Sequence, residues 1–447
     1  MPRNRTILAA LSGACLGALP GLGFAQVIEP LVPIPPLPTG PEAPPVPGQP
    51  GVVGRTVTDR PRPEYDPLGV KAGEFFFFPR IELDESHNDN IFALQSNKQG
   101  SWITTLMPSF DVLSNFPSNA INFSAGGAFG RYSGHSSEDF NDGFGRLSGR
   151  YDMTALNHLM GSVSFDRSHE PRTSPTSPGA AAEPVKFSTY NATAGVSQTG
   201  TRIGYEVDGA VTRSEFEAPP AVGGGFIPQD DRNVTGYEGA VRLSYEFIPD
   251  FQAYVRGSGN TQQFDHAAGN GISIRNSNGF RFDVGARLDL TGVTYAEFYA
   301  GYLEQDYQAS QFGSIDGVDF GASIVWNFST LDTLRITSAR AVNNSSAEVV
   351  GVSTSPGYLS NVSAVSLDHE LLRNLLLNAN ATYESDDWKG ISRTDNVFGF
   401  GVGAKYLFNR NLYLGVSYNW AHRYSSGTQQ TTPYSQNIFL LRLSTQI

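Results

Sequence analysis

The chain has 447 residues, of which 17% are charged, and its formal net charge at pH 7 is −12. This acidic balance argues against nucleic acid as a partner, because phosphate binding needs clustered lysine and arginine. After residue 25, no apolar run reaches the roughly 18 residues that a membrane-spanning helix needs, which excludes a helical inner-membrane protein.

Residues 1–25 have the pattern of a secretory signal peptide. Two arginines precede an apolar stretch over residues 7–22, and a small-x-small cleavage site lies directly before Gln26. Cleavage there would remove both arginines, changing the charge from −12 to −14, and also Cys15, the single cysteine. The mature chain would then have no thiol for a disulfide or a metal. The alternative is a lipoprotein acylated at Cys15, but Ser12 stands where a large aliphatic residue is expected.

Residues 26–72 form a proline-rich segment. Twelve prolines lie between Val27 and Asp66. Proline favours neither a helix interior nor a sheet ladder, so this composition predicts an extended linker, mostly in the polyproline-II conformation. The simplest interpretation is a periplasmic spacer. The alternative is a tether that touches a periplasmic partner or enters the lumen of the barrel that follows.

From about Phe75 to the last residue, apolar and polar or small residues alternate in stretches of about ten. In residues 280–290, apolar side chains occupy every second position, while Arg281, Asp283, Arg287 and Asp289 occupy positions between them. Successive side chains of a strand point to opposite faces. A soluble sandwich does not bury a face of alternating charges, whereas a membrane barrel has lipid outside and water inside. The pattern therefore predicts an all-β, transmembrane, antiparallel up-and-down barrel over residues 73–447.

Two kinds of connection alternate along this region. Short turns are predicted at 115–119, 155–157, around 200, 248–250, 291–292, 329–332, 369–373 and 409–411. Longer loops are predicted at 91–100, 133–141, 170–184, 218–232, 265–277, 308–313, 344–354, 387–392 and 426–433. Together they separate about eighteen strands, with tight turns and both chain ends on the periplasmic side. A count of sixteen is the alternative, because residues 333–343 and 355–367 alternate less cleanly.

Aromatic residues gather at the strand ends, where their rings are expected to form interfacial girdles. These residues are Tyr205, Tyr245, Phe247, Phe251, Trp326, Phe328, Tyr406 and Phe408. For each of them, a lipid-facing anchor is a simpler interpretation than a ring that stacks on a ligand.

The face opposite the apolar wall is expected to line an aqueous channel, because eighteen strands are too many for side chains to fill. The predicted pore-lining residues are Arg146, Arg150, Asp152, Arg202, Glu206, Asp208, Glu238, Arg242, Glu246, Arg256, Arg281, Asp283, Arg287, Asp289, Lys405 and Arg442. Their simplest role is to pair across neighbouring strands and keep a wide wall rigid and hydrated. The alternative is an ion screen, or a hydrogen-bonding track for a polar polymer such as a polysaccharide. Long loops that fold inward would narrow the channel further.

No catalytic or cofactor motif stands out. Seven histidines are scattered along the chain without an HExxH pair, and no Gly-x-Ser-x-Gly elbow occurs, so we expect no enzyme and no cofactor. Asp84, Glu85 and Asp89 offer oxygen ligands of the kind that bind calcium, but exposed loop carboxylates are the simpler interpretation.

Three segments near the start of the barrel resemble a known family. Residues 68–79 read LGVKAGEFFFFP, residues 85–92 read ESHNDNIF, and residues 103–108 read ITTLMP. This succession is similar to the opening of the β-barrel porin 2 family of outer-membrane proteins. The resemblance implies the outer membrane of a Gram-negative bacterium and a link to the synthesis and export of capsular polysaccharide or exopolysaccharide. The chain departs from the usual barrel assembly signal by ending on Ile447, not on Phe or Trp.

Three functions are then open. The first is a wide channel for export of an exopolysaccharide or capsular polysaccharide, with outer-membrane lipid, the polymer and periplasmic export proteins as partners. The second is a general diffusion porin for small polar solutes. The third is a structural or adhesive barrel, which very long aromatic-rich loops would favour, and such loops are missing.

Overall fold

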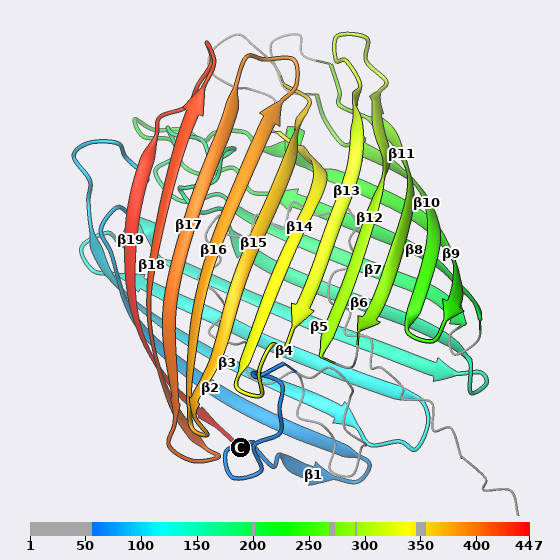
Figure 1. Cartoon of the computed structure of the whole chain (residues 1–447). Coiled ribbons are helices and arrows are strands. Elements are labelled where there is room, and N and C mark those ends of the chain that lie inside the picture. The colour runs from blue at the N-terminus through cyan, green and yellow to red at the C-terminus, as the bar shows by residue number, and fades with distance from the viewer. Residues whose placement is uncertain (1–55, 199–201, 268–272, 291–292, 346–354) are drawn as a thin grey trace, which may run out of the picture.

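The computed structural model describes residues 56–447 apart from 199–201, 268–272, 291–292 and 346–354. Within this part of the chain, eighteen long antiparallel strands, β2 to β19, follow one another around a closed barrel (Figure 1). The barrel closes where Ile438–Gln446 of β19 pairs with Arg80–Asn88 of β2. The predicted all-β barrel of about eighteen strands is therefore confirmed.

The strands are β1 (Val70–Ala72), β2 (Phe75–Asn88), β3 (Ser101–Ser114), β4 (Ala120–Tyr132), β5 (Phe140–Asp152), β6 (Asn157–His169), β7 (Lys186–Gln198), β8 (Ile203–Phe216), β9 (Val234–Ile248), β10 (Phe251–Phe264), β11 (Ser277–Leu290), β12 (Thr294–Tyr307), β13 (Ile315–Trp326), β14 (Asp332–Asn344), β15 (Gly357–Leu372), β16 (Leu375–Trp388), β17 (Thr394–Leu407), β18 (Leu412–Ser426) and β19 (Tyr434–Gln446). Two short 3-10 helices, η1 (Ser136–Glu138) and η2 (Asp230–Arg232), lie in the connections. Among the described residues, no helix has the length and apolar character needed to cross a membrane.

Short turns gather at one end of the barrel and longer loops at the other. The end with the short turns also holds β1 and the carboxyl terminus (Figure 1). The less regular stretch 333–343 lies within β14, and all but the first two residues of 355–367 lie within β15, so the alternative of sixteen strands is wrong. The turn predicted at 369–373 lies at 373–374, because β15 continues to Leu372 through an irregularity after Glu370.

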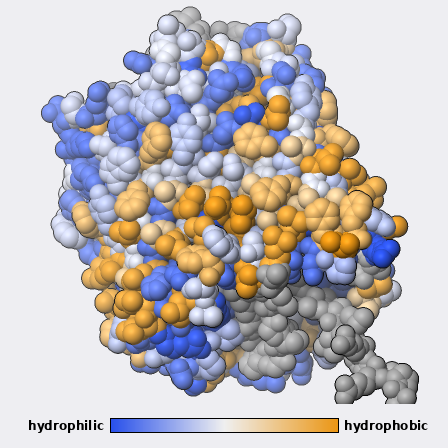
Figure 2. Space-filling view, viewed as in Figure 1, coloured by the Kyte–Doolittle hydropathy of each residue, from blue (hydrophilic) through white to orange (hydrophobic). Residues whose placement is uncertain are grey.

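The outer face of the wall is apolar. Phe282 and Val284 of β11 are 55% and 53% exposed, and Phe439 and Leu441 of β19 are similarly exposed. Hydrophobic residues form a belt across the side seen in Figure 2, with hydrophilic residues above and below it. Because the faces alternate along each strand, this exposure places the polar set inside the barrel.

Aromatic pairs mark the short-turn edge of this belt. Trp326 and Phe328 have ring centroids 5.4 Å apart, and Tyr406 and Phe408 have centroids 4.9 Å apart. All four rings are exposed. This is the position expected for rings at a membrane interface.

Strand β1 covers a free edge at the seam of the barrel. Strand β19 ends where the amide of Ile447 donates to the carbonyl of Pro79, at 3.2 Å. Below that point β1 pairs with Phe75–Phe77 of β2. Pro79 has no N–H to donate and lies where the neighbour of β2 changes from β19 to β1, which is a position that tolerates proline.

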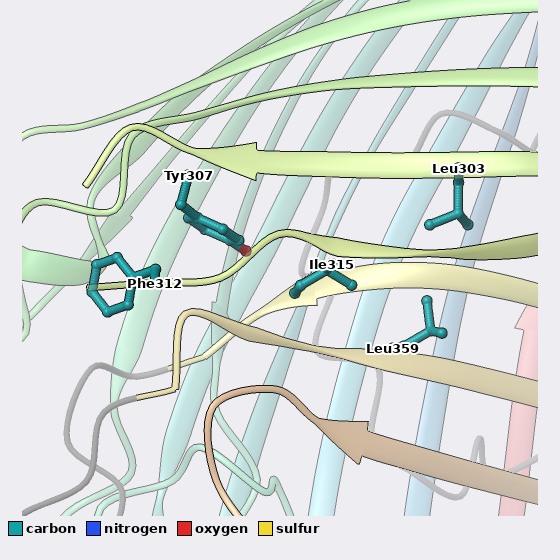
Figure 3. Packing of buried hydrophobic residues seen from close by; sticks show 5 residues of the cluster. All are labelled: Leu303, Tyr307, Phe312, Ile315 and Leu359. Atoms are coloured by element: carbon teal, nitrogen blue, oxygen red, sulfur yellow. The ribbon is translucent and has the colours of Figure 1, made fainter. Parts of the chain in front are cut away.

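The ladder between β13 and β14 is incomplete. Only Gly321–Trp326 pairs with Leu334–Ala339, so the remaining halves of the two strands are not paired with each other. Beside this opening, Leu303 of β12, Ile315 of β13 and Leu359 of β15 form a buried apolar cluster with Tyr307 and Phe312 (Figure 3). Apolar contacts between side chains thus hold the hairpin of β14 and β15 where backbone hydrogen bonds are absent.

A pair of arginine substitutions in β6 tests which face meets lipid. Val163 is the central residue of β6 and is 52% exposed, whereas Ser162 lies on the inner face and shares a hydrogen bond with Thr193. We expect Val163→Arg to lower the free energy of unfolding from lipid vesicles by about 2–4 kcal/mol, because the charge would meet hydrocarbon. Ser162→Arg, whose charge would meet water, should lower the free energy of unfolding by much less. Equal losses in urea titrations of both variants would contradict the assignment of faces.

Candidate channel lumen

The predicted pore-lining residues lie on the inner face of the strands that carry them. Each occupies a position that alternates with exposed apolar residues, as Arg281 and Asp283 do between Phe280, Phe282 and Val284. Arg202 differs, because it is an exposed residue in the connection before β8. The inner face is therefore a polar, charged surface.

Glu297 of β12 is the centre of one charge cluster on this face. Its two carboxylate oxygens lie 3.1 Å from Arg242 of β9 and 3.0 Å from Arg287 of β11. The guanidinium of Arg242 also lies 3.6 Å from the ring centroid of Tyr254 in β10. Two positive charges and one negative charge from three strands are thus brought together. The two arginines belong to the predicted pore-lining set, whereas Glu297 does not.

Inward tyrosines lie against glycines of the neighbouring strand. Tyr254 pairs with Gly285, and Tyr299 pairs with Gly321. A Cβ atom on Gly285 would lie 2.3 Å from the Tyr254 ring, and one on Gly321 would lie 2.2 Å from the Tyr299 ring. The absence of a side chain at both glycines lets the rings lie flat on the wall and thickens it from inside.

A second charge cluster crosses the seam between β19 and β2. Arg442 donates two hydrogen bonds of 2.7 Å to Asp84 and lies 3.6 Å from Glu82. Tyr413 donates to Glu82, and the Lys405 ammonium lies 3.9 Å from the Tyr413 ring centroid. Bidentate pairing of this kind fixes the relative position of two strands. The closing strand pair is therefore held by side chains as well as by its ladder.

The three carboxylates of Asp84, Glu85 and Asp89, which could in principle bind calcium, do not lie together. Asp84 faces Arg442 on the inner face, whereas Glu85 accepts a hydrogen bond from Thr104 and Asp89 accepts two from Asn437. In the described part of the chain, no group of three or more His, Cys, Asp or Glu residues is arranged to hold a metal ion.

Several histidines pair with carboxylates. The Nδ1 atom of His158 lies 2.8 Å from Asp152, which also accepts from Arg150, and His369 lies 2.7 Å from Asp332. His158 is buried although it takes part in no catalytic motif. No fixed sequence spacing links a histidine to its carboxylate partner, so the sequence alone does not predict these pairs.

At the long-loop end, the connection 170–185 crosses the mouth. Glu170 is fully buried and accepts hydrogen bonds of 3.0 and 3.1 Å from Arg232, which belongs to the connection between β8 and β9. Further along the same loop, the carbonyl of Thr173 accepts a hydrogen bond of 3.0 Å from Arg423 of β18. A loop that begins after β6 thus reaches the wall at β18 and narrows the opening.

The charge of Glu170 is stabilised in place. Burial opposes its ionisation, but Arg232 and the hydroxyls of Thr176 and Ser174 outweigh that effect and lower the pKa of the carboxyl below its usual value. A lowered pKa means that the stabilisation is present above the ordinary pKa of glutamate and is lost only as the pH falls through the lowered value. The docked loop is therefore expected to be stable at neutral pH.

A family model described as "Putative beta-barrel porin 2" matches residues 62–447. The chain belongs to this family of β-barrel porins. As a member of this porin family, it is a channel of the Gram-negative outer membrane and not an enzyme. The short turns therefore face the periplasm and the long loops face the outside. No curated relative matches the chain.

The chain is also similar to several solved structures, at low sequence identity and with TM-scores below 0.5. OpdL of Pseudomonas aeruginosa is 11% identical with a TM-score of 0.42, and the match covers 84% of this chain and 100% of that one. OccK2 (OpdF) of the same organism, solved with glucuronate, is 10% identical with a TM-score of 0.44 over 84% and 98% of the two chains. The copper transporter OprC is 11% identical with a TM-score of 0.45 over 85% and 81%.

Neutralising Glu297 is expected to change ion selectivity. Glu297→Gln would leave Arg242 and Arg287 without their shared carboxylate, so the reversal potential across a bilayer in a KCl gradient should shift toward chloride. Glu304→Gln, which removes the same charge from the outer face of β12, is the matched control and should leave the reversal potential unchanged. Equal potentials for wild type and Glu297→Gln would show that this cluster does not face the ion path.

Neutralising Glu170 is expected to release the loop over the outer mouth. Glu170→Gln should make the bonds after Arg172 and Arg232 accessible to trypsin on intact cells, because breaking one side of a buried pair leaves an unpaired buried charge. Glu183→Gln, at an exposed position of the same loop, should leave the loop protected. Because the pKa of Glu170 is lowered, protection of the wild type should not vary across the neutral pH range.

Proposed function

We propose that the chain is a conduit for polar, hydroxyl-rich solutes and takes part in the export of an exopolysaccharide or capsular polysaccharide. The observation that carries this proposal is the compensated charge of the inner face, where carboxylates and guanidinium groups alternate in pairs. Such a wall offers many hydrogen-bond donors and acceptors without a large region of a single sign. The resemblance of residues 68–108 to porins linked with polysaccharide synthesis and export points the same way.

The charge clusters suit a polymer in physical terms. A chain of sugars that moves along the wall would exchange one set of hydrogen bonds for an equivalent set, because both donors and acceptors recur from β5 to β12. Arg146 and Asp166 near one side of the barrel, and Arg287 and Glu297 further round, are each paired at 3.0 Å. Arg146 and Arg287 remain about 60% exposed as side chains, so their free donors face the lumen. Weak, repeated binding of this kind allows passage.

A general diffusion porin for small polar solutes is the second candidate. The arginine–carboxylate pairs of the inner face favour this function as well. Charges that are already paired with each other do not require a polymer to bind them, and a hydrated wall of mixed charge admits many small solutes. Either function is passive and needs no chemistry from the chain. The two candidates differ in whether a polymer is the physiological solute.

Deletion and reconstitution distinguish them. If the chain exports a polymer, a clean deletion should reduce the amount or the length of secreted polysaccharide, and the intact chain supplied in trans should restore both. Purified protein in planar bilayers should then show ion current that the isolated polymer blocks. A deletion strain with unchanged polymer, together with a strong current that the polymer does not affect, would reject the export function and support the diffusion porin.

A further inference from the structure

Residues 56–66 lie in the periplasmic mouth of the barrel. The backbone N–H of Val57 donates a hydrogen bond of 2.8 Å to the hydroxyl of Thr333, a residue of β14. Val57 and Thr333 both have 0% exposure. In Figure 1 this part of the chain, at the blue end of the colour range, runs at the end with the short turns near β1. A segment that precedes the barrel in sequence is thus packed against its inner face.

A buried ion pair fixes this segment to the wall. Arg62 lies 2.8 Å from Glu370 of β15, and the two side chains are only 4% and 8% exposed. The same guanidinium donates 2.7 Å to the carbonyl of Val57, which closes the segment into a compact turn. Two charges removed from water are tolerated only while they remain paired. Glu370 therefore specifies one seated position for Arg62.

Further contacts spread the segment across three adjacent periplasmic turns. Arg60 donates to the carbonyl of Thr330 between β13 and β14. Arg373, between β15 and β16, donates 3.0 Å to the carbonyl of Pro61. Arg410, between β17 and β18, donates 2.8 Å to the carbonyl of Pro63. The segment is therefore attached at several points along about a third of the rim, and not by a single contact.

The segment also covers inner-face side chains that would otherwise face the lumen. Arg335 of β14 donates 2.9 Å to the hydroxyl of Thr56 and lies 3.4 Å from Asp59. A simple linker would not bury a charge pair or occupy hydrogen-bonding groups of the channel wall. The contacts are polar and separable, unlike the apolar contacts that hold the β14–β15 hairpin.

From these contacts we propose that residues 56–66 are a periplasmic plug, which restricts the channel while Arg62 is paired with Glu370 and frees it when the segment is withdrawn. The proline-rich residues 26–55 directly precede the plug, so tension on them would act on its first residue. The plug requires conduction through the lumen, which both candidate functions share, and does not depend on the identity of the solute.

Breaking the ion pair in the full-length protein tests the plug. Arg62→Ala or Glu370→Ala should raise the conducting fraction in planar bilayers on the order of tenfold, because either change breaks the buried ion pair that fixes the segment to the wall. The double variant Arg62→Glu with Glu370→Arg should restore the restricted state. Glu64→Ala, an exposed acidic residue of the same segment, is the matched control and should behave as wild type. Wild-type conductance in both alanine variants, with the barrel still resistant to SDS, would overturn the plug.

A reversible disulfide tests the plug within one folded protein, because the same molecules are measured before and after reduction. Val57→Cys and Thr333→Cys introduced together with Arg62→Ala put cysteines at two positions joined by the hydrogen bond from the Val57 N–H to Thr333, and the only other cysteine of the chain is Cys15 in the predicted signal peptide. Oxidation should return the current to the wild-type level, and reductant should raise it again in the same membrane. Equal current before and after reduction would overturn the plug. If neither the oxidised nor the reduced protein conducts, the channel function itself fails together with the plug.

Discussion

The structure depends on one constraint, which is that hydrocarbon offers no hydrogen bonds to the backbone. Each strand must pair on both sides, and the sheet can satisfy this only by closing. The pairing of β19 with β2 provides that closure, and β1 continues it below Pro79, where β19 has ended. The strict alternation of apolar and polar residues follows, because a closed wall has lipid on one side and water on the other. The girdles, the loop asymmetry and the charged lumen are consequences of the same closure.

Strands β13 and β14 pair along only part of their length, and side chains take the place of the missing backbone hydrogen bonds. Above Gly321 the two strands separate, and the Arg340 side chain donates 2.8 Å to the carbonyl of Val318 on the β13 edge. Leu303, Ile315 and Leu359 fill the adjoining space (Figure 3). One charged side chain and one apolar cluster thus replace several backbone hydrogen bonds. The unpaired strand edges are confined to this opening, because the rest of the wall is continuous.

The architecture was predictable from sequence because it rests on local periodicity, whereas the site was predictable only in part. Alternation such as that of residues 280–290 fixes which side chains share a face, so Arg281 and Arg287 were identified as inward. Their partners were harder to identify, since Arg287 meets Glu297 only when β11 and β12 adopt their register. Glu170 and Arg232 are separated by 62 residues, and Arg62 and Glu370 by 308. No periodicity encodes such pairs, because only barrel closure brings them together.

The two mouths of the channel use the same chemistry for segments that are not strands. At the outer mouth Glu170 of a loop is buried with Arg232, and at the periplasmic mouth Arg62 of the leading segment is buried with Glu370. Hydrophobic docking would suit the proposed plug poorly, because that segment must remain soluble when it is withdrawn into water. A buried ion pair combines a single well-defined seated position with a hydrated alternative, since both partners regain their solvation on separation. The wall itself needs no such alternative, and there backbone ladders and apolar clusters carry the stability.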